Sequence, residues 1–265
     1  MYAKKSLGQN FLMHARIAER IALVAELKSD ATVFEIGPGT GMLTRALLQR
    51  AGKVIALEAD HELFEKLKMD FANEIVSGRL ELMHGDIRTF DISTLPKKYV
   101  LVANIPYYLT GEIFRMFLES ENQPRAMTLL VQKEVADRIA RSNPDAKRSG
   151  PRPKRRGKES ILSLSVKAYG TPKREFLVPR GAFKPAPKVD SAVLTIRNIS
   201  RKNFKNKKEE ERFFALLHAG FAHKRKFVRK NLVEAGFTRQ DLVTIPEKAR
   251  AEDLMLSDWL ALAKI

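Results

Sequence analysis

The first 135 residues alternate short apolar runs with amphipathic stretches. The apolar runs have the length of strands and predict strands at residues 32–36, 53–58, 80–82, 100–103 and 127–131. Between them lie stretches with apolar side chains at helical spacing, such as Leu63, Leu67 and Phe71. Strands separated by helices predict an α/β fold with a mostly parallel sheet covered on both faces.

The pattern changes in the second half of the chain. Further strands are predicted at residues 161–167, 175–178 and 191–199. From about Lys207 the apolar spacing is helical to the end. We therefore predict two domains, an α/β domain over residues 1–199 and a small all-helical domain over residues 200–265.

Charge divides the chain into two unequal halves. Residues 1–140 carry 18 basic and 18 acidic side chains, whereas residues 141–265 carry 30 and 13, so the whole net charge of +17 lies in the second half. A neutral part beside a basic part indicates divided roles, with chemistry in the first part and a polyanionic partner for the second.

Two basic clusters contribute to this excess. Residues 141–158 mix eight basic residues and one acid with Pro and Gly, which is typical of a mobile loop. The candidate polyanion contacts in this loop are Arg152, Lys154, Arg155 and Arg156. The second cluster has helical apolar spacing, and its candidates are Lys224, Arg225, Lys226, Arg229 and Lys230. Either cluster alone is interpreted as a solvated surface. Two clusters in the same half of the chain instead favour contact with phosphate groups, and binding of this kind depends strongly on salt concentration.

Composition excludes several classes of function. The chain has no cysteine, which excludes disulfides, thiolate metal sites and cysteine nucleophiles. No apolar run approaches the ~20 residues that span a bilayer, and the N-terminal residues lead into no signal-peptide core. We therefore expect a soluble, cytoplasmic protein with no membrane partner.

A glycine-rich turn after the first strand marks the candidate site. Gly37, Gly39 and Gly41 allow the backbone to approach a ligand at the carboxyl edge of the sheet. Glu58 ends the next strand, 21 residues after Gly37, where a carboxylate can bind ribose hydroxyls. The spacing of a dinucleotide site requires glycine at position 42, so Met42 disfavours an NAD-dependent oxidoreductase.

Polar residues also end the third and fourth strands. Asp86 is either a helix cap or, at the same sheet edge as Glu58, an acceptor for an adenine amine. Asn104-Ile105-Pro106-Tyr107 is the most specific motif in the chain. One interpretation is a strand followed by a turn with a packed Tyr107. In the other, the Asn104 amide and the Ile105 carbonyl hold the amine protons of an adenine on which Tyr107 stacks.

These motifs in this order resemble a known family, the rRNA adenine dimethyltransferases. The resemblance extends from Leu7 to the C-terminus and is carried by Gln9-Asn10-Phe11-Leu12, Gly37–Gly41, Glu58, Gly85-Asp86, Asn104–Tyr107 and the segment from Phe183 to Val193. It implies a Rossmann-like class I methyltransferase fold with a helical C-terminal domain that docks on rRNA. The closing segment 252–260 is similar to the tail of the housekeeping small-subunit enzymes.

The resemblance also implies a reaction and its partners. The methyl donor is S-adenosyl-L-methionine, and the substrate is small-subunit rRNA within the ribosomal subunit or its precursor. Two adjacent adenosines near the 3′ end of that RNA receive two methyl groups each on the exocyclic amine. The reaction requires no metal, and we expect the enzyme to act as a monomer.

Individual residues acquire roles from the same resemblance. Those expected to bind the donor are Asn10, Leu12, Gly37, Gly39, Glu58, Asp86, Ile87 and Asn104. Those expected at the reacting amine are Asn104, Ile105, Pro106, Tyr107 and Phe183. Phe183 would stack on the target base opposite Tyr107, while Asn104 borders both substrates.

One residue and one segment depart from the family pattern. Tyr108 stands where many members have asparagine, and residues 147–158 resemble a basic insertion in place of a short loop.

Two other functions stay open. The antibiotic-resistance (Erm) branch, which modifies large-subunit rRNA, shares the catalytic motifs. A non-catalytic RNA-binding assembly factor is the third possibility, against which the intact Glu58 and Asn104–Tyr107 motif argue.

Overall fold

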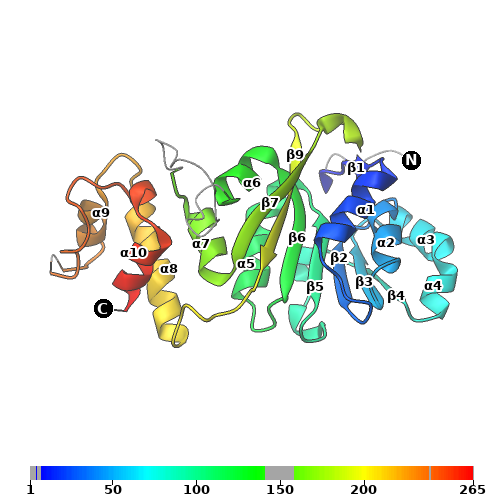
Figure 1. Ribbon diagram of the computed structural model, residues 1–265, viewed down its shortest axis with the longest axis horizontal. Coiled ribbons are helices and arrows are strands. Elements are labelled where there is room, and N and C mark those ends of the chain that lie inside the picture. Colours follow the sequence, from blue (N-terminus) through cyan, green and yellow to red (C-terminus); the bar gives the residue numbers. More distant parts are fainter. Residues whose placement is uncertain (1–3, 5–6, 141–157, 239, 265) are drawn as a thin grey trace, which may run out of the picture. The chain divides into compact units, whose positions relative to one another are not determined.

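The computed structural model describes the chain except for residues 1–3, 5–6, 141–157, 239 and 265 (Figure 1). Its contacts group the chain into two compact units, one of Met1–Ala136 and Lys173–Ile199, the other of Asp137–Pro172 and Ser200–Ile265. The break after Ile199 coincides with the boundary predicted from the sequence. Residues 137–172 differ from that prediction, because they belong to the second unit rather than the first.

A seven-stranded sheet in the order β4-β3-β2-β5-β6-β9-β7 forms the centre of the first unit. Its parallel strands are β2 (Thr32–Ile36), β3 (Lys53–Glu58), β4 (Leu80–His84), β5 (Val100–Asn104) and β6 (Ala126–Gln132). Strand β9 (Ser191–Arg197) runs antiparallel to β6, and β7 (Thr171–Val178) forms the edge. The mostly parallel α/β sheet predicted from the apolar runs is confirmed.

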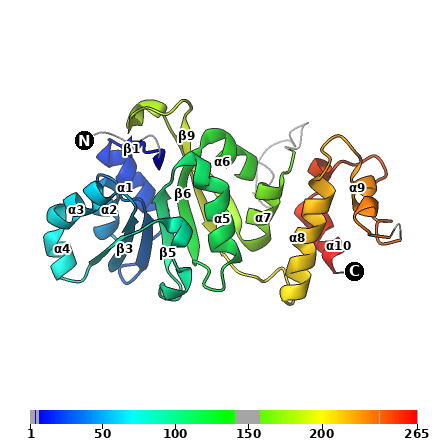
Figure 2. The same ribbon diagram turned by 180° about the vertical axis from the view of Figure 1, so that it is seen from behind.

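Helices cover both faces of this sheet. Helices α1 (Ala15–Val24) and α2 (Met42–Leu48) pack together on one face, and α5 (Thr110–Glu119) lies on the other (Figures 1 and 2). The switch follows from right-handed crossovers, because the chain moves outward from β2 to β4 and then returns to β5 and proceeds to β6. This unit also contains α3 (His61–Asp70) and α4 (Ala72–Val76). Helix α6 (Lys133–Ala140) begins in the first unit and ends in the second.

Side chains that alternate along the strands build two apolar layers. Val33 packs into a cluster with residues of α1 and α2 such as Ile21 and Leu47. The next residue, Phe34, points to the opposite face, where its ring stacks on Phe90 with centroids 5.1 Å apart. Because this strand is buried on both sides, its carboxyl end is held rigidly at the sheet edge.

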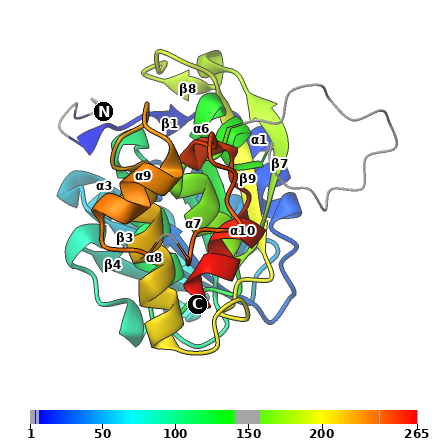
Figure 3. The ribbon, with the colours of Figure 1, turned by 90° about the vertical axis from the view of Figure 1, so that its left-hand side faces the viewer.

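The second unit is helical. Its helices are α7 (Ile161–Tyr169), α8 (Lys207–Phe221), α9 (Val228–Glu234) and α10 (Leu256–Ala263). Helices α8 and α10 lie side by side (Figures 1 and 3). Trp259 of α10 is fully buried, and a Cβ at Gly220 of α8 would come within 2.3 Å of its ring. Glycine at position 220 therefore sets how closely the two helices pack.

The strand predicted at residues 161–167 is wrong, because this segment is helix α7. Leu162, Leu164 and Val166 alternate with serines, which mimics the period of a strand. Ser160 instead begins a helix with a capping box that includes Ser163. Three polar residues, Glu159, Ser163 and Lys167, are then spaced four positions apart. The buried Lys167 ammonium lies 2.7 Å from the Glu159 carboxylate. Burial lowers the pKa of Lys167 against the opposing effect of that carboxylate.

The continuous helical spacing predicted for the second basic cluster is also wrong, because two helices and a connection occupy this segment. Helix α8 ends at Phe221 and α9 begins at Val228, so Lys224, Arg225 and Lys226 lie in the connection between them. A backbone hydrogen bond from Lys226 to the oxygen of His223 closes a turn there. The apolar residues on either side belong to two different helices, which is why their spacing imitated one continuous helix.

Candidate functional site

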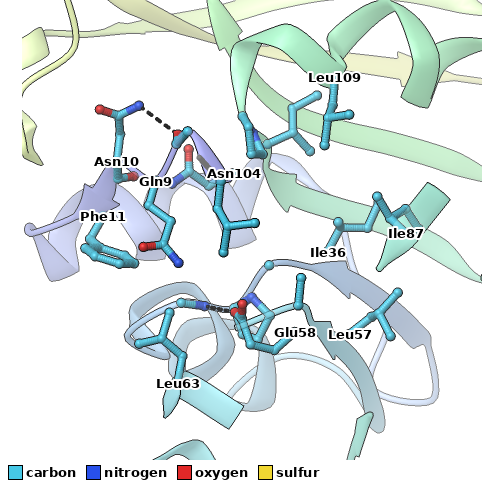
Figure 4. Close-up of a pocket in the computed structure, with 18 of the residues that line it drawn as sticks. Gln9, Asn10, Phe11, Ile36, Leu57, Glu58, Leu63, Ile87, Asn104 and Leu109 are labelled. Carbon is cyan, nitrogen blue, oxygen red and sulfur yellow. Dashed lines mark hydrogen bonds between the residues drawn. The ribbon is translucent and has the colours of Figure 1, made fainter. Parts of the chain in front are cut away.

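A pocket lies at the carboxyl edge of the first unit's sheet, where β2, β3 and β5 end (Figure 4). It encloses about 1060 Å³, including the open solvent at its mouth. Its walls contain every residue that the sequence assigned to the donor or to the reacting amine: Asn10, Leu12, Gly37, Gly39, Glu58, Asp86, Ile87, Asn104, Ile105, Pro106, Tyr107 and Phe183. The fold therefore gathers residues from 10 to 183 at one place.

The glycine-rich turn forms one wall of the pocket. Gly37, Gly39 and Gly41 have φ angles of 64°, 60° and 77°, in the left-handed region that favours glycine. A Cβ at Gly41 would come within 2.5 Å of the Phe71 ring. Apart from its chain neighbours, a Cβ at Gly37 would meet no described residue within 4 Å. Gly41 is thus required by packing, and Gly37 presents bare backbone to the pocket.

Glu58 stands at the end of β3 and is buried. Its two carboxylate oxygens accept hydrogen bonds of 2.9 Å from the backbone N–H groups of Gly39 and Asp60. Burial raises the pKa of Glu58, although these hydrogen bonds oppose the rise. Each oxygen retains a further lone pair, so the fixed carboxylate can accept hydrogen bonds from ligand hydroxyls.

Glu35 is a second buried carboxyl in the pocket wall, which the sequence analysis missed. The hydroxyl of Thr44 donates to it at 2.7 Å, and its burial raises the pKa to about 8. A glutamate inside an otherwise apolar strand, next to the glycine-rich turn, is the sequence signal that marks this position.

Asp86 acts as a helix cap in this structure. Its carboxylate accepts the backbone N–H of Arg88 at 2.9 Å and also pairs with the Arg88 guanidinium. The hydrogen bonds from Arg88 hold the pKa of Asp86 below its usual range. Ile87, the next residue, is buried and lines the pocket, so one side of this turn is apolar and the other carries charge.

Residues 7–12, which we call the strap, form another wall of the pocket (Figure 4). Gln9 donates to the carboxylate of Asp60 at 3.1 Å, and the ammonium of Lys4 reaches the same carboxylate at 2.8 Å. Strand β1 (Phe11–Leu12) of the strap pairs with β8 (Phe183–Lys184). The strap is therefore attached on one side next to Glu58 and on the other next to Phe183.

Asn104 lies at the end of β5, where the strap orients its side chain. Its Nδ2 atom donates to the backbone oxygen of Asn10 at 3.0 Å. No residue in the described part of the chain donates a hydrogen bond to its Oδ1 atom. The side chain therefore presents an oriented acceptor.

The two aromatic residues assigned to the target base both line the pocket. The Tyr107 hydroxyl hydrogen-bonds to the Oγ atom of the buried Ser191 at 2.6 Å, which holds the half-buried ring at the pocket wall. Burial raises the pKa of Tyr107. Phe183 is 5% exposed, and Tyr108 is 59% exposed beside Gly8 of the strap. Tyr108 thus widens the aromatic surface at the mouth.

The basic residues assigned to RNA lie in the second unit or outside the described residues. Arg152, Lys154, Arg155 and Arg156 fall in the segment that the structure does not describe. Lys226 pairs with Glu234 at 2.9 Å, and Arg229 donates to the backbone oxygens of Ile245 and Val243 at 2.6 and 3.0 Å. Lys224, Arg225 and Lys230 are exposed and make no ion pair with any described residue.

The described residues contain no group of three or more His, Asp or Glu side chains arranged to hold a metal ion. They also contain no helix that is both long enough and apolar enough to cross a bilayer.

Solved structures of known proteins resemble this one along nearly its whole length. The 23S rRNA methyltransferase ErmE is 26% identical with a TM-score of 0.75, and the match covers 96% of this chain and 98% of that one. A dimethyladenosine transferase from Plasmodium falciparum is 25% identical with a TM-score of 0.73, covering 95% of each chain. These likenesses confirm the class I methyltransferase fold.

Relatives found by sequence are also named as rRNA methyltransferases. The "Ribosomal RNA small subunit methyltransferase A" of Dehalococcoides mccartyi is 36% identical over 273 residues, covering 99% of this chain and 88% of the relative. The protein of the same name from Thermosynechococcus vestitus is 38% identical over 273 residues, covering 99% and 96%. The family model described as ribosomal RNA adenine dimethylase matches residues 1–265. The chain therefore belongs to the ribosomal RNA adenine dimethylase family.

Proposed function

We propose that this protein dimethylates the exocyclic amines of two adjacent adenosines near the 3′ end of small-subunit rRNA, using S-adenosyl-L-methionine. It acts in the cytoplasm as a monomer, on the ribosomal subunit or its precursor. The observation that carries this proposal is the oriented Asn104 amide, which faces the same pocket as the fixed carboxylate of Glu58. One pocket thus offers an acceptor for an amine beside an acceptor for ribose.

The donor end of the pocket fits S-adenosyl-L-methionine, which when bound supplies an electrophilic methyl group. The bare backbone at Gly37 leaves room for the methionine part, because a Cβ there would meet no described residue within 4 Å apart from its two chain neighbours. Glu58 would accept hydrogen bonds from the ribose hydroxyls, while Asp86 and Ile87, which line the same pocket, would bind the adenine. Asp86 must share its carboxylate with Arg88 to do so.

The target end holds the adenine amine. The lone pair of this amine is delocalised into the ring, so the nitrogen is a weak nucleophile. Asn104 Oδ1 and the Ile105 carbonyl accept the two amine hydrogens and favour a tetrahedral nitrogen, while Tyr107 and Phe183 hold the base. Methylation releases one proton, which passes to water, since no His or Lys is among the described residues that line the pocket.

The choice of the small subunit is supported by the relatives. The two proteins named as small-subunit methyltransferases are 36% and 38% identical to this chain, whereas the large-subunit enzyme ErmE is 26% identical. The catalytic motifs are shared between the two branches, so the difference must lie in how each enzyme docks on its RNA.

The test is transfer of radiolabelled methyl groups to unmodified small and large ribosomal subunits, followed by mapping of the modified nucleotides. We expect two adjacent dimethyladenosines in small-subunit rRNA. Modification of the large subunit alone would replace this proposal by the resistance-type activity. The variant Glu58→Ala should weaken donor binding about 10- to 150-fold, as expected for loss of a charge-assisted hydrogen bond. A protein that neither binds the donor nor transfers methyl groups would be a non-catalytic assembly factor.

A further inference from the structure

A second hollow opens at the same edge of the sheet, outside the donor pocket. It measures about 860 Å³ including open solvent, and it lies where β6 passes into α6 and where the loop before β9 returns. Its lining residues are Gln132, Lys133, Glu134, Arg180, Lys188, Val189 and Asp190. All of them belong to the first unit, so its geometry does not depend on the second.

Three cations line this hollow without a partner in the described part of the chain. Lys133, Arg180 and Lys188 are exposed, and their side chains make no hydrogen bond or ion pair with any described residue. The two carboxylates of the lining are differently placed. Asp190 accepts the backbone N–H of Arg180 at 3.0 Å, and Glu134 is engaged by another interaction. The hollow therefore offers cations whose charge is not neutralised by a fixed partner.

Asp190 connects the hollow to the proposed reaction site. Its backbone oxygen accepts the N–H of Lys133 at 3.0 Å, which joins the start of α6 to the loop before β9. The next residue, Ser191, hydrogen-bonds to the Tyr107 hydroxyl at 2.6 Å. The cations are thus built into the same strand ends and loop that position Tyr107.

We propose that this hollow binds a backbone phosphate of the nucleotide next to the target adenosine. The inference rests on the proposed function, because it concerns the RNA that presents the target base. An enzyme that extracts a base must hold the flanking backbone while the base leaves its stack. Arginine and lysine at a concave surface are suited to a phosphate, which carries charge but no sequence information.

The test compares two triple variants of the full chain with equal loss of charge. The first is Lys133→Gln, Arg180→Gln and Lys188→Gln. The control is Lys28→Gln, Arg50→Gln and Lys97→Gln, which removes two lysines and one arginine from exposed positions that precede β2, β3 and β5 at the opposite sheet edge. Binding of unmodified small subunits and of protein-free rRNA is measured between 50 and 200 mM KCl, together with kcat and KM.

For the first variant we expect a KM for subunits raised on the order of 10-fold or more at low salt, with kcat and donor affinity within several-fold of wild type. The slope of binding against salt should fall by about 2, since each contact to single-stranded nucleic acid contributes about 0.7. The control should keep the wild-type slope. The charge-preserving variants Arg180→Lys and Lys188→Arg should retain binding.

Three outcomes would overturn the phosphate site. The first is an unchanged salt slope in the first variant, and the second is an equal loss of RNA-binding affinity in the control. The third is a loss of affinity for intact subunits with no loss of affinity for protein-free rRNA. The last would assign the hollow to a ribosomal protein. If the wild-type enzyme transfers no methyl group to small subunits, the proposed function fails. The comparison of rRNA binding between the two variants still tests whether the hollow binds a phosphate.

Discussion

The Nδ2 atom of Asn104 donates a hydrogen bond of 3.0 Å to the backbone oxygen of Asn10, 94 positions away in the chain. A side-chain amide has its donor and its acceptor on opposite branches, so this bond decides where the Oδ1 atom points. Asn10 is itself placed by the strap, which Gln9 attaches to Asp60 at 3.1 Å. The orientation of the proposed catalytic amide therefore depends on N-terminal residues that line the same pocket.

Replacing Asn104 should affect the rate far more than donor binding. We expect Asn104→Ala to lower kcat on the order of 100- to 1000-fold, because the proposed role of this group is to act on the amine in the transition state. Asn104→Asp should lose a similar factor, since a carboxylate cannot donate to the Asn10 oxygen. Single-turnover methyl transfer gives the rate, and calorimetry should find donor affinity within several-fold of wild type. Full activity in Asn104→Ala would remove this residue from the mechanism.

The Tyr107 ring and its hydroxyl should make separable contributions. The hydroxyl is held by Ser191 at 2.6 Å, whereas Tyr107 as a whole lines the pocket. Tyr107→Phe and Ser191→Ala should each cost about 10-fold or less in kcat/KM, and the double variant should cost no more than either alone. Tyr107→Ala should cost more than 100-fold, as expected for loss of base stacking. Additive effects in the double variant would contradict the coupling.

The central strands were predictable because burial on both faces leaves no alternative to a continuous apolar run. Strands β2 and β3 begin and end at the predicted residues, 32–36 and 53–58. The pocket residues that follow parallel strands, such as Glu58 and Asn104, were predictable for a related reason, since the carboxyl ends of parallel strands meet at one edge. Asn10, Leu12 and Phe183 lie in or beside the separate β1–β8 pair, and only the resemblance to the family pointed to them. Glu35 was missed because a single glutamate in an apolar strand does not alter the apolar pattern.

Elements in the second unit were harder to predict because their contacts are decided by tertiary structure. Alternation of serine with leucine and valine in α7 imitates a strand, and only the four-residue spacing of Glu159, Ser163 and Lys167 reveals the helix. Around residue 223, the apolar side chains at the end of α8 and at the start of α9 happen to share one helical spacing, although a connection separates the two helices. The hydrogen bonds of Arg229 to residues 243 and 245 have no local sequence signal at all.

Stability should fall with rising pH because of Glu35. Its burial raises the pKa to about 8 from an ordinary value of 4.5, so between these values the folded chain retains a proton that the unfolded chain releases. The free energy of unfolding therefore decreases from about pH 4.5 to about pH 8 and levels off above, by a few kcal/mol at most at about 1.4 kcal/mol per pKa unit.

The variant Glu35→Gln removes this proton while its side-chain oxygen can still accept from Thr44. Urea unfolding at pH 5, 7 and 9 should show a smaller loss of stability for the variant than for wild type. The difference between the two proteins should be greatest at pH 9. Parallel curves for the two proteins would mean that Glu35 titrates alike in the folded and the unfolded chain.

The basic residues near the start of α9 should separate into two groups with different effects. Lys224, Arg225 and Lys230 are exposed, and Arg229 is fixed by the backbone oxygens of Val243 and Ile245. Neutralising the three exposed residues together should weaken binding of small subunits and lower the salt slope by about 0.7 to 0.9 per lost contact. Donor affinity and the urea midpoint should stay at wild-type values.

Arg229→Gln provides the contrast, because it removes hydrogen bonds that join α9 to the segment around residue 245. We expect a loss of about 1 to 3 kcal/mol in the free energy of unfolding, as for backbone oxygens that lose a charged donor. Its salt slope should change little, since the guanidinium is already engaged within the second unit. Filter binding of subunits across a salt series, together with urea unfolding, measures both quantities for the two variants. A reduced salt slope in Arg229→Gln with unchanged stability would instead make Arg229 a direct phosphate contact.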